Sequence, residues 1–369
     1  MCDSSDEWRG LSMNHGDSDF NRHADQMISE NPLSEAKDRE IPVQTTLGQD
    51  WVVPTGKPSA RRRVISASKR TDIPAFHLPW FAERVREGWV KVRNPLFYRA
   101  ENAERFSIRV SLRPEDVAAI VWWSKNYAVY LRPTFYRTFE IYEQQRFQFT
   151  INPRGSKYAW LEPDVPNLDE ALRQVRELAA RRGSDSIRWR YDPIVFWRDG
   201  QADCSSWDPD FFQRMCEELA AVGVPTCITS IVDRYRKFEH RVRLLFPDIQ
   251  LRDPSPGELD DLVGAMTDIA GHHGIALEAC SEPLLERYPV FRRASCIDGH
   301  VLGASTSKAS DQRMKGRETC GCTRHTDIGD YELQECGYAC LYCYANPNHR
   351  RFRRETKRSN LGGQEKEHL

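Results

Sequence analysis

Short apolar runs alternate with longer amphipathic runs along most of this chain, and the alternation restricts the fold more than any other feature. The short runs have the length and the β-branched or aromatic content of buried strands, and the longer runs repeat apolar residues with a helical period. The strand-like runs are residues 63–68, 118–124, 146–152, 187–196, 225–231 and 275–280. The helical runs are residues 76–88, 168–182, 209–222 and 257–272. Strands separated by helices require a parallel sheet, so the sequence predicts an α/β fold.

Six such strands predict a parallel (β/α) barrel or a partial barrel. An open, doubly wound sheet is the alternative, and it is disfavoured because no glycine-rich dinucleotide fingerprint follows any strand. We expect the barrel domain to cover residues 59–319 and a cysteine-rich loop, residues 320–347, to complete it. Residues 1–58 are rich in Asp, Glu, Ser, Asn and Gln and lack a sustained period, so we expect them to be largely disordered. Residues 348–369 form a basic, polar tail.

Charge and hydropathy exclude several classes of partner. The chain has 53 Lys and Arg residues against 54 Asp and Glu residues, so no global field attracts nucleic acid or an anionic membrane. No apolar stretch approaches the roughly 20 residues of a membrane helix, and the acidic N-terminus lacks the features of a secretory signal. We therefore expect a cytoplasmic protein without a membrane partner. Nucleic acid could bind to the basic run at residues 349–354, for which a solvated helix face is the alternative.

Five of the eleven cysteines lie between residues 320 and 343, and three of these have a distinctive spacing. In a cytosolic chain, such clustering favours metal binding or catalysis over disulfides. Cys336, Cys340 and Cys343 can bend around one face of a 4Fe–4S cluster, and Gly337 gives the loop backbone freedom. Three ligands leave one iron open, which is what a catalytic metal needs. Two alternatives are a zinc site completed by another cysteine and a cluster with only a structural or electron-transfer role.

The three-cysteine motif also has an aromatic residue, Tyr342, directly before its last cysteine. With that residue, the motif resembles the signature of the radical S-adenosylmethionine superfamily. In that superfamily the open iron binds the amino and carboxylate groups of S-adenosylmethionine, and an electron from the cluster cleaves the sulfonium to give a 5′-deoxyadenosyl radical. The resemblance implies an enzyme of this type, with Tyr342 contacting the adenosyl group. It also implies an unknown substrate and a reducing electron donor such as a flavodoxin or ferredoxin.

The order of the motifs differs from that superfamily, because here the cysteines lie near the C-terminus. This order, with the polar run at residues 66–74 and Cys-Gly-Cys at residues 320–322, resembles an uncharacterised bacterial family, the domain-of-unknown-function 1848 family. The resemblance covers roughly residues 62–347, and it implies an iron–sulfur cluster with no established reaction. Two other functions remain open. One is a redox or electron-transfer protein without S-adenosylmethionine chemistry, and the other is a zinc-stabilised nucleic-acid-binding module.

A second set of four cysteines is a further candidate metal site. Four thiolates could close a structural zinc site or hold an auxiliary iron–sulfur cluster. The spacings are long, so the sequence does not show whether the four side chains meet, and buried free thiols are the alternative. The members of this set are Cys280, Cys296, Cys320 and Cys322.

Polar side chains follow several of the predicted strands. Because the C-terminal ends of strands build the active site of a barrel, we expect these side chains to face one cavity. The basic members could hold a carboxylate or phosphate, and the acidic members could bind an ammonium or ribose hydroxyls. The predicted catalytic residues are Arg70, Asp72, Lys125 and Asp192, and the predicted cofactor-binding residues are Ser66, Glu278 and Tyr342. Solvated strand ends and structural ion pairs are the alternative.

The barrel hypothesis makes one geometric demand on the cysteine loop. The loop must lie over the carboxyl ends of the strands, with its three sulfurs within a few ångströms of one another. Residues 325–334 are the candidate return strand, and we expect them to pair beside residues 64–68. A loop at the opposite end of the strands would contradict the hypothesis.

Overall fold

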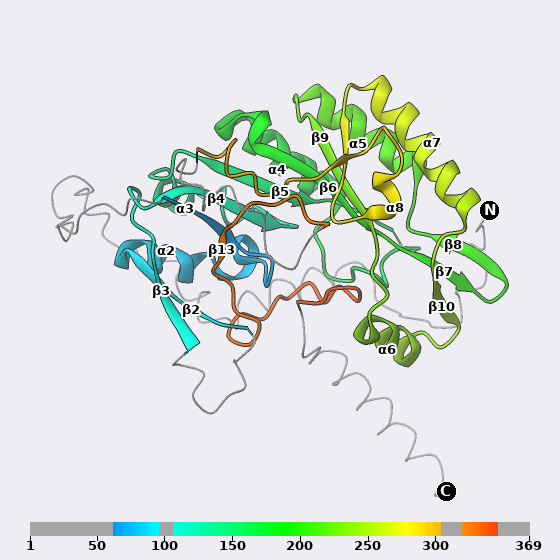
Figure 1. Cartoon of the computed structure of the whole chain (residues 1–369), viewed down its shortest axis with the longest axis horizontal. Coiled ribbons are helices and arrows are strands. Elements are labelled where there is room, and N and C mark those ends of the chain that lie inside the picture. Colours follow the sequence, from blue (N-terminus) through cyan, green and yellow to red (C-terminus); the bar gives the residue numbers. More distant parts are fainter. Residues whose placement is uncertain (1–61, 96–105, 156, 304–318, 346–369) are drawn as a thin grey trace, which may run out of the picture. The chain divides into compact units, whose positions relative to one another are not determined.

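The structure is a computed structural model, and its core is a parallel sheet with helices on one face (Figure 1). The N-terminal segment 1–58 and the tail 348–369, for which we predicted disorder and a basic surface, lie outside the described residues. The described residues are 62–95, 106–155, 157–303 and 319–345.

Eight strands form the main sheet, in the order β12, β11, β9, β6, β5, β4, β1 and β13, and every neighbouring pair is parallel. The strands are β1 Arg63–Ala67, β4 Val117–Ser124, β5 Gln145–Thr150, β6 Ile187–Ile194, β9 Thr226–Ile231, β11 Ala276–Ala279, β12 Arg292–Arg293 and β13 Thr326–Asp327. The α/β prediction is therefore confirmed, and all six predicted strands occur. Within the described part of the chain β12 and β13 do not pair with each other, so the arrangement is a parallel sheet rather than a closed barrel.

The helices that connect these strands begin at well-formed caps. Asn167 and Asp208 accept hydrogen bonds from the first turns of α4 and α5, and Ser255 forms a capping box with Glu258 at the start of α7. The helices are α2 Leu78–Glu87, α3 Pro133–Phe139, α4 Leu168–Arg182, α5 Pro209–Ala221, α6 Arg236–Leu245, α7 Pro256–His272 and α8 Pro283–Glu286, with the short turns η3 Ile73–His77 and η5 Ser184–Ser186. None of the described helices has the length and apolar character needed to cross a membrane.

Side-chain alternation divides the sheet into two different faces. Ile65 and Trp122 belong to the large core that includes the inner sides of the helices, of which α4, α5 and α7 are seen together on one side in Figure 1. Their neighbours Val64 and Val121 point to the other face. That face is covered by residues from the segments after β12 and before β13, which form a smaller core.

Two small antiparallel sheets were not predicted. β2 Trp89–Arg93 pairs with β3 Ser107–Ser111, and β7 Phe196–Asp199 pairs with both β8 Ala202–Ser205 and β10 Ile249–Arg252. The predicted strand 187–196 therefore covers the whole of β6 and the first residue of β7. These strands are only four or five residues long, too short for a clear periodic signal.

The predicted return of the C-terminal segment to the first strand is confirmed. β13 runs parallel to β1, with Thr326 beside Ile65 and Asp327 beside Ser66. The Asp327 carboxylate accepts hydrogen bonds from the hydroxyls of Ser66 and Ser68, at 2.8 and 2.6 Å. These bonds bring the three-cysteine loop to the carboxyl edge of the sheet, because only residues 328–334 separate β13 from that loop.

Candidate functional site

The loop of residues 335–343 lies at the carboxyl ends of the parallel strands, as the barrel hypothesis requires. The hydroxyl of Tyr342 is 3.1 Å from Nζ of Lys125, which follows β4. It is also 3.4 Å from Nδ2 of Asn152, which follows β5. A motif from the end of the chain therefore occupies the edge where ligands bind in parallel α/β sheets.

Side chains next to and within α6 hold the backbone of this loop. Arg241 donates from one nitrogen to the carbonyls of Leu341, at 2.7 Å, and Cys343, at 2.9 Å. The Tyr235 hydroxyl donates to the carbonyl of Tyr342. Consecutive carbonyls of the loop are thus satisfied by the protein, which fixes the path of the backbone around the last cysteine.

Gly337 was expected to give the loop backbone conformational freedom, but the structure indicates that it is needed for close packing. Its backbone is not among the described glycines with positive φ, so the expected conformational freedom is not used. A Cβ at this position would instead lie 2.8 Å from Cε1 of Phe76, closer than real Cβ contacts. The ring of Phe76 also packs edge-on against Tyr338, with centroids 4.7 Å apart. Gly337 therefore admits an aromatic ring against the loop backbone.

The three loop thiols are largely shielded from water. Cys340 is buried, and Cys336 and Cys343 are half-buried. Burial raises the pKa of Cys336 to about 12, although backbone N–H groups of Tyr338 and Asp72 bond to it. Burial also raises the pKa of Cys340. In the described part of the chain no three His, Cys, Asp or Glu side chains are arranged to hold one metal ion, so the three sulfurs do not surround a single ion position.

A buried carboxylate, that of Glu162, organises the polar groups around Tyr342. Its oxygens accept hydrogen bonds from Lys125 at 2.8 Å, Arg154 at 2.8 Å and Asn152 at 2.6 Å, and also from the Tyr342 hydroxyl. Burial alone would raise the pKa of Glu162, but the two cations and the hydrogen bonds outweigh burial and lower it to about 2. Lys125 and Tyr342, both predicted site residues, therefore meet at a fixed anion.

Asp72, a predicted catalytic residue, is occupied by bonds within the protein. Its carboxylate accepts from the Ser124 hydroxyl at 2.8 and 2.9 Å, from the Lys125 backbone at 2.9 Å and from the Ala75 backbone at 3.0 Å. Burial raises its pKa to about 7 despite these bonds. Asp72 thus caps the η3 turn and ties the end of β1 to the end of β4.

Arg70 and Ser66 contact the returning C-terminal segment rather than the Tyr342 group. Arg70 donates to the Gly329 carbonyl at 3.1 Å, pairs with Asp327 at 3.9 Å and lies over the ring of Tyr331. Ser66 donates to Asp327. Both predicted site residues therefore hold the segment that leads into the cysteine loop.

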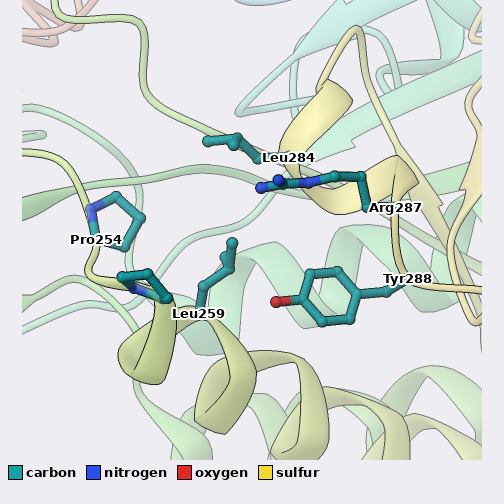
Figure 2. A pocket seen from close by; sticks show the side chains of 6 residues that line it. Pro254, Leu259, Leu284, Arg287 and Tyr288 are labelled. Carbon is teal, nitrogen blue, oxygen red and sulfur yellow. The ribbon is translucent and has the colours of Figure 1, made fainter.

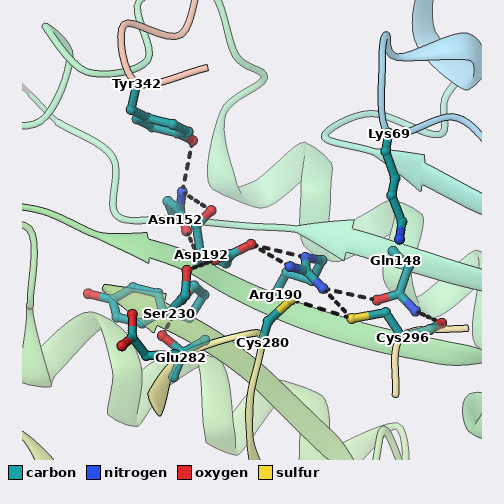
Figure 3. Close-up of polar contacts among 12 residues, drawn as sticks. Lys69, Gln148, Asn152, Arg190, Asp192, Ser230, Cys280, Glu282, Cys296 and Tyr342 are labelled. Carbon is teal, nitrogen blue, oxygen red and sulfur yellow. Dashed lines mark hydrogen bonds and ion pairs between the residues drawn. The ribbon is translucent and has the colours of Figure 1, made fainter. Parts of the chain in front are cut away.

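A chain of polar contacts connects Tyr342 with the second cysteine set across the face of the sheet (Figure 3). Asn152 contacts the Tyr342 hydroxyl and accepts from the Asp192 backbone at 2.9 Å. The Asp192 carboxylate pairs with Arg190 at 2.5 Å, and Arg190 donates to the sulfur of Cys296 at 3.1 Å. Asp192 therefore belongs to the same polar network as Lys125 and Tyr342.

The four cysteines of the second set lie together. The sulfurs of Cys280 and Cys296 are 3.7 Å apart (Figure 3). Side-chain contacts continue from Cys296 to Cys322 and from Cys322 to Cys320. Lys69 reaches the sulfur of Cys322 at 3.9 Å. The four side chains therefore meet, but they are free thiols, and among the described residues no three of them are arranged to hold one metal ion.

Glu278, predicted to bind a cofactor, lies apart from Tyr342. Its neighbours in β11, Leu277 and Ala279, pack in the core on the helix side, so Glu278 points to the opposite face. Burial raises the pKa of Glu278, and the charges of Arg188 and Arg292 oppose that rise. Its surroundings are those of a carboxylate balanced by strand arginines.

Three polar residues of the site were not predicted. Asn152 follows β5, so the strand-end rule that selected Lys125 would have found it. Glu162 lies in an irregular segment between β5 and α4, and Arg241 lies on α6. No local pattern marks either one, because their bonds to the loop are to residues 100 or more positions away.

A shallow apolar pocket lies elsewhere, beside α7 and α8 (Figure 2). None of the predicted site residues lines it. Its walls are Pro254, Pro256, Leu259, Leu284, Arg287 and Tyr288.

Comparison with known proteins gives one family. A family model described as a domain of unknown function, DUF1848, matches residues 64–345, which is most of the chain. The match begins in β1 and ends just after the cysteine loop, so it treats the sheet and the loop as one domain. A search of the curated proteins gave no match.

Proposed function

The chain belongs to the DUF1848 family, and from this premise we propose that it is an iron–sulfur enzyme of the radical S-adenosylmethionine type. Cys336, Cys340 and Cys343 are the proposed ligands of a 4Fe–4S cluster. The observation that carries the proposal is the place of their loop, at the carboxyl ends of the parallel strands and beside a buried, charged network. The same proposal includes a partial barrel, a cytoplasmic location and a flavodoxin-like or ferredoxin-like electron donor.

The donor set suits a cluster better than a single ion. A cubane cluster distributes its thiolates over separate irons, so three sulfurs need not surround one point. The loop offers three shielded thiols, and its carbonyls are already bonded to Arg241 and Tyr235. Bound there, the cluster would supply one electron to the sulfonium of S-adenosylmethionine, giving methionine and a 5′-deoxyadenosyl radical that takes hydrogen from a substrate.

The neighbouring side chains would position the substrate molecules and exclude water. Glu162 holds Lys125 and the Tyr342 hydroxyl in one place, so the ring of Tyr342 presents a fixed surface beside the cluster loop. The cation of Lys125 lies where it can bind a carboxylate group. Both roles depend on pre-organised geometry, which the buried, hydrogen-bonded Glu162 network provides.

Anaerobic purification of the full chain tests the proposal. We expect a brown protein whose iron content falls by about four atoms per chain when the three loop cysteines are replaced by Ala. With a strong reductant, the native protein should form 5′-deoxyadenosine from S-adenosylmethionine, and the variant should not. A triple variant that keeps all its iron would refute the cluster assignment.

The same assay separates the leading function from an electron-transfer role. Intact iron with no 5′-deoxyadenosine under strong reduction would exclude the radical reaction and leave a redox protein. A colourless protein that contains only zinc would instead favour the nucleic-acid-binding alternative.

A further inference from the structure

Four cysteines from three separate segments converge on the face of the sheet that is opposite the helices. Cys280 follows β11, Cys296 follows β12, and Cys320 and Cys322 precede β13. We propose that these four thiolates hold a second metal centre, occupied by a thiophilic metal and independent of the loop at the carboxyl edge. The shared chemistry is four-thiolate ligation, which both zinc and iron accept.

The closest pair already has the spacing of two ligands on one metal. Metal–sulfur bonds of 2.3 Å in a tetrahedral site place two sulfurs about 3.8 Å apart. The sulfurs of Cys280 and Cys296 are 3.7 Å apart. Cys322 contacts Cys296 and Cys320 contacts Cys322, so the four sulfurs form a chain. If the side chains of Cys320 and Cys322 rotate, the four sulfurs can surround one metal.

The backbone is built to keep the segments in register. A Cβ on Gly321 would lie 2.4 Å from the Ala294 carbonyl oxygen, so only glycine allows the Cys-Gly-Cys turn to pack this closely. The Ser295 hydroxyl donates to the Gly321 carbonyl at 2.8 Å, and the Thr323 N–H donates to the Ile297 carbonyl at 2.9 Å. These contacts hold the turn that carries two of the thiols directly against the segment that carries a third.

The charges around the thiols also favour an anionic centre. Arg190 is only 6% exposed, pairs with Asp192 and directs a further nitrogen at the Cys296 sulfur. Across the described residues, the ammonium of Lys69 contacts the Cys322 sulfur and the Trp123 ring, and it pairs with no carboxylate. Neutral thiols are weak partners for such cations, whereas four thiolates on a divalent metal carry a net charge of −2. The two cations would then act as outer-shell partners of the ligands.

The test measures metal in the full chain after the loop cysteines, Cys336, Cys340 and Cys343, have been replaced by Ala. Any metal that remains belongs to the second site. We expect about one zinc ion per chain, or two to four iron atoms with thiolate-to-iron absorption, and the absorption distinguishes the two metals. Adding Cys296→Ser should remove this metal, whereas Cys216→Ser, which alters a buried thiol in α5, should leave it.

A second variant controls for the possibility that ligand replacement unfolds the protein. Lys69→Gln leaves all four ligands in place, and loss of an outer-shell partner weakens metal affinity by about 10- to 100-fold. We expect that loss in a competition titration with Zn²⁺, with an unchanged circular dichroism spectrum. A loop triple variant without any bound metal, or full metal retention after Cys296→Ser is added, would overturn the proposal. Because the loop cysteines are absent throughout, this result does not depend on the proposed radical reaction.

Discussion

The two groups of cysteines in this protein differ in how the chain brings them together. The three in the loop lie within a span of eight residues, and contacts from η3, α6 and the strand ends fix their backbone. The four on the sheet face come from segments between β11 and β13, which lie at or near opposite edges of the sheet, and packing of these segments across the sheet face brings them together. A local motif can be read from spacing alone, whereas the second group becomes a site only through the parallel sheet.

Their surroundings differ as well. The loop thiols are buried beside charges of both signs, the carboxylates of Asp72 and Glu162 and the ammonium of Lys125. The thiols on the sheet face lie near two cations, Lys69 and Arg190. Three ligands suit a centre with an open position for chemistry, and four suit a closed centre. The comparison thus suggests one reactive and one supporting metal site.

Single ligand replacements should separate the two sites most clearly. We expect Cys340→Ala to reduce 5′-deoxyadenosine formation by more than about 100-fold, because even outer-shell changes at metal sites cost 10- to 100-fold. Cys296→Ser should reduce it by about tenfold or less, since it leaves the loop ligands intact. Product yield per iron, measured by chromatography, checks both values. Equal losses in the two variants would show that the sites are not functionally distinct.

Arg241 provides the next largest effect, because its guanidinium bonds to two carbonyls of the loop backbone. Arg241→Ala should lower the free energy of unfolding by about 3 kcal/mol, since it removes two charge-assisted hydrogen bonds from a buried guanidinium. It should also speed the loss of loop iron to a chelator while leaving the second metal in place. Arg243→Ala, on the exposed side of the same helix, is the matched control and should change neither quantity.

These residues also show what the sequence could and could not predict. The main strands and helices were found because burial on one face imposes a period, and β4 and α4 occur almost where expected. The site was found only in part. Lys125 and Asp192 follow or end strands, so a topological rule selects them, whereas Glu162 and Arg241 depend on tertiary contacts between distant segments. Closure of a barrel likewise depends on side-by-side placement of edge strands, which periodicity does not encode.

Glu162 makes the stability of the protein depend on pH, and this effect concerns only the site around the three-cysteine loop. The pKa of Glu162 falls from the usual 4.5 to about 2 on folding, so the unfolded chain binds the proton more tightly. The resulting stabilisation, about 3 kcal/mol, is complete above pH 4.5 and is lost as the pH falls towards 2. Glu162→Gln should remove this part of the acid transition, as followed by urea unfolding between pH 5 and 2. An unchanged acid transition would mean that the carboxylate is not ionised in the folded protein.

The smallest effects concern the two glycines that allow close packing beside each cysteine group. Gly321 approaches a backbone carbonyl, that of Ala294, and Gly337 approaches the ring of Phe76, which is 38% exposed. A backbone oxygen in a packed segment cannot move away, whereas an exposed ring can rotate. We therefore expect Gly321→Ala to cost about 2 kcal/mol of stability and Gly337→Ala about 1 kcal/mol.

Double mutants distinguish the two glycines, because the clash at Gly337 is with a side chain that can be removed and the clash at Gly321 is with a backbone carbonyl. Removing the ring with Phe76→Ala should cancel most of the cost of Gly337→Ala, since the added methyl group then meets open space. The same ring deletion should leave the cost of Gly321→Ala unchanged, because that contact involves only the backbone near β12. Additive costs for Gly337→Ala and Phe76→Ala would show that the ring is not what excludes a side chain there. In that case the tight path of the loop backbone would itself be the constraint on this position.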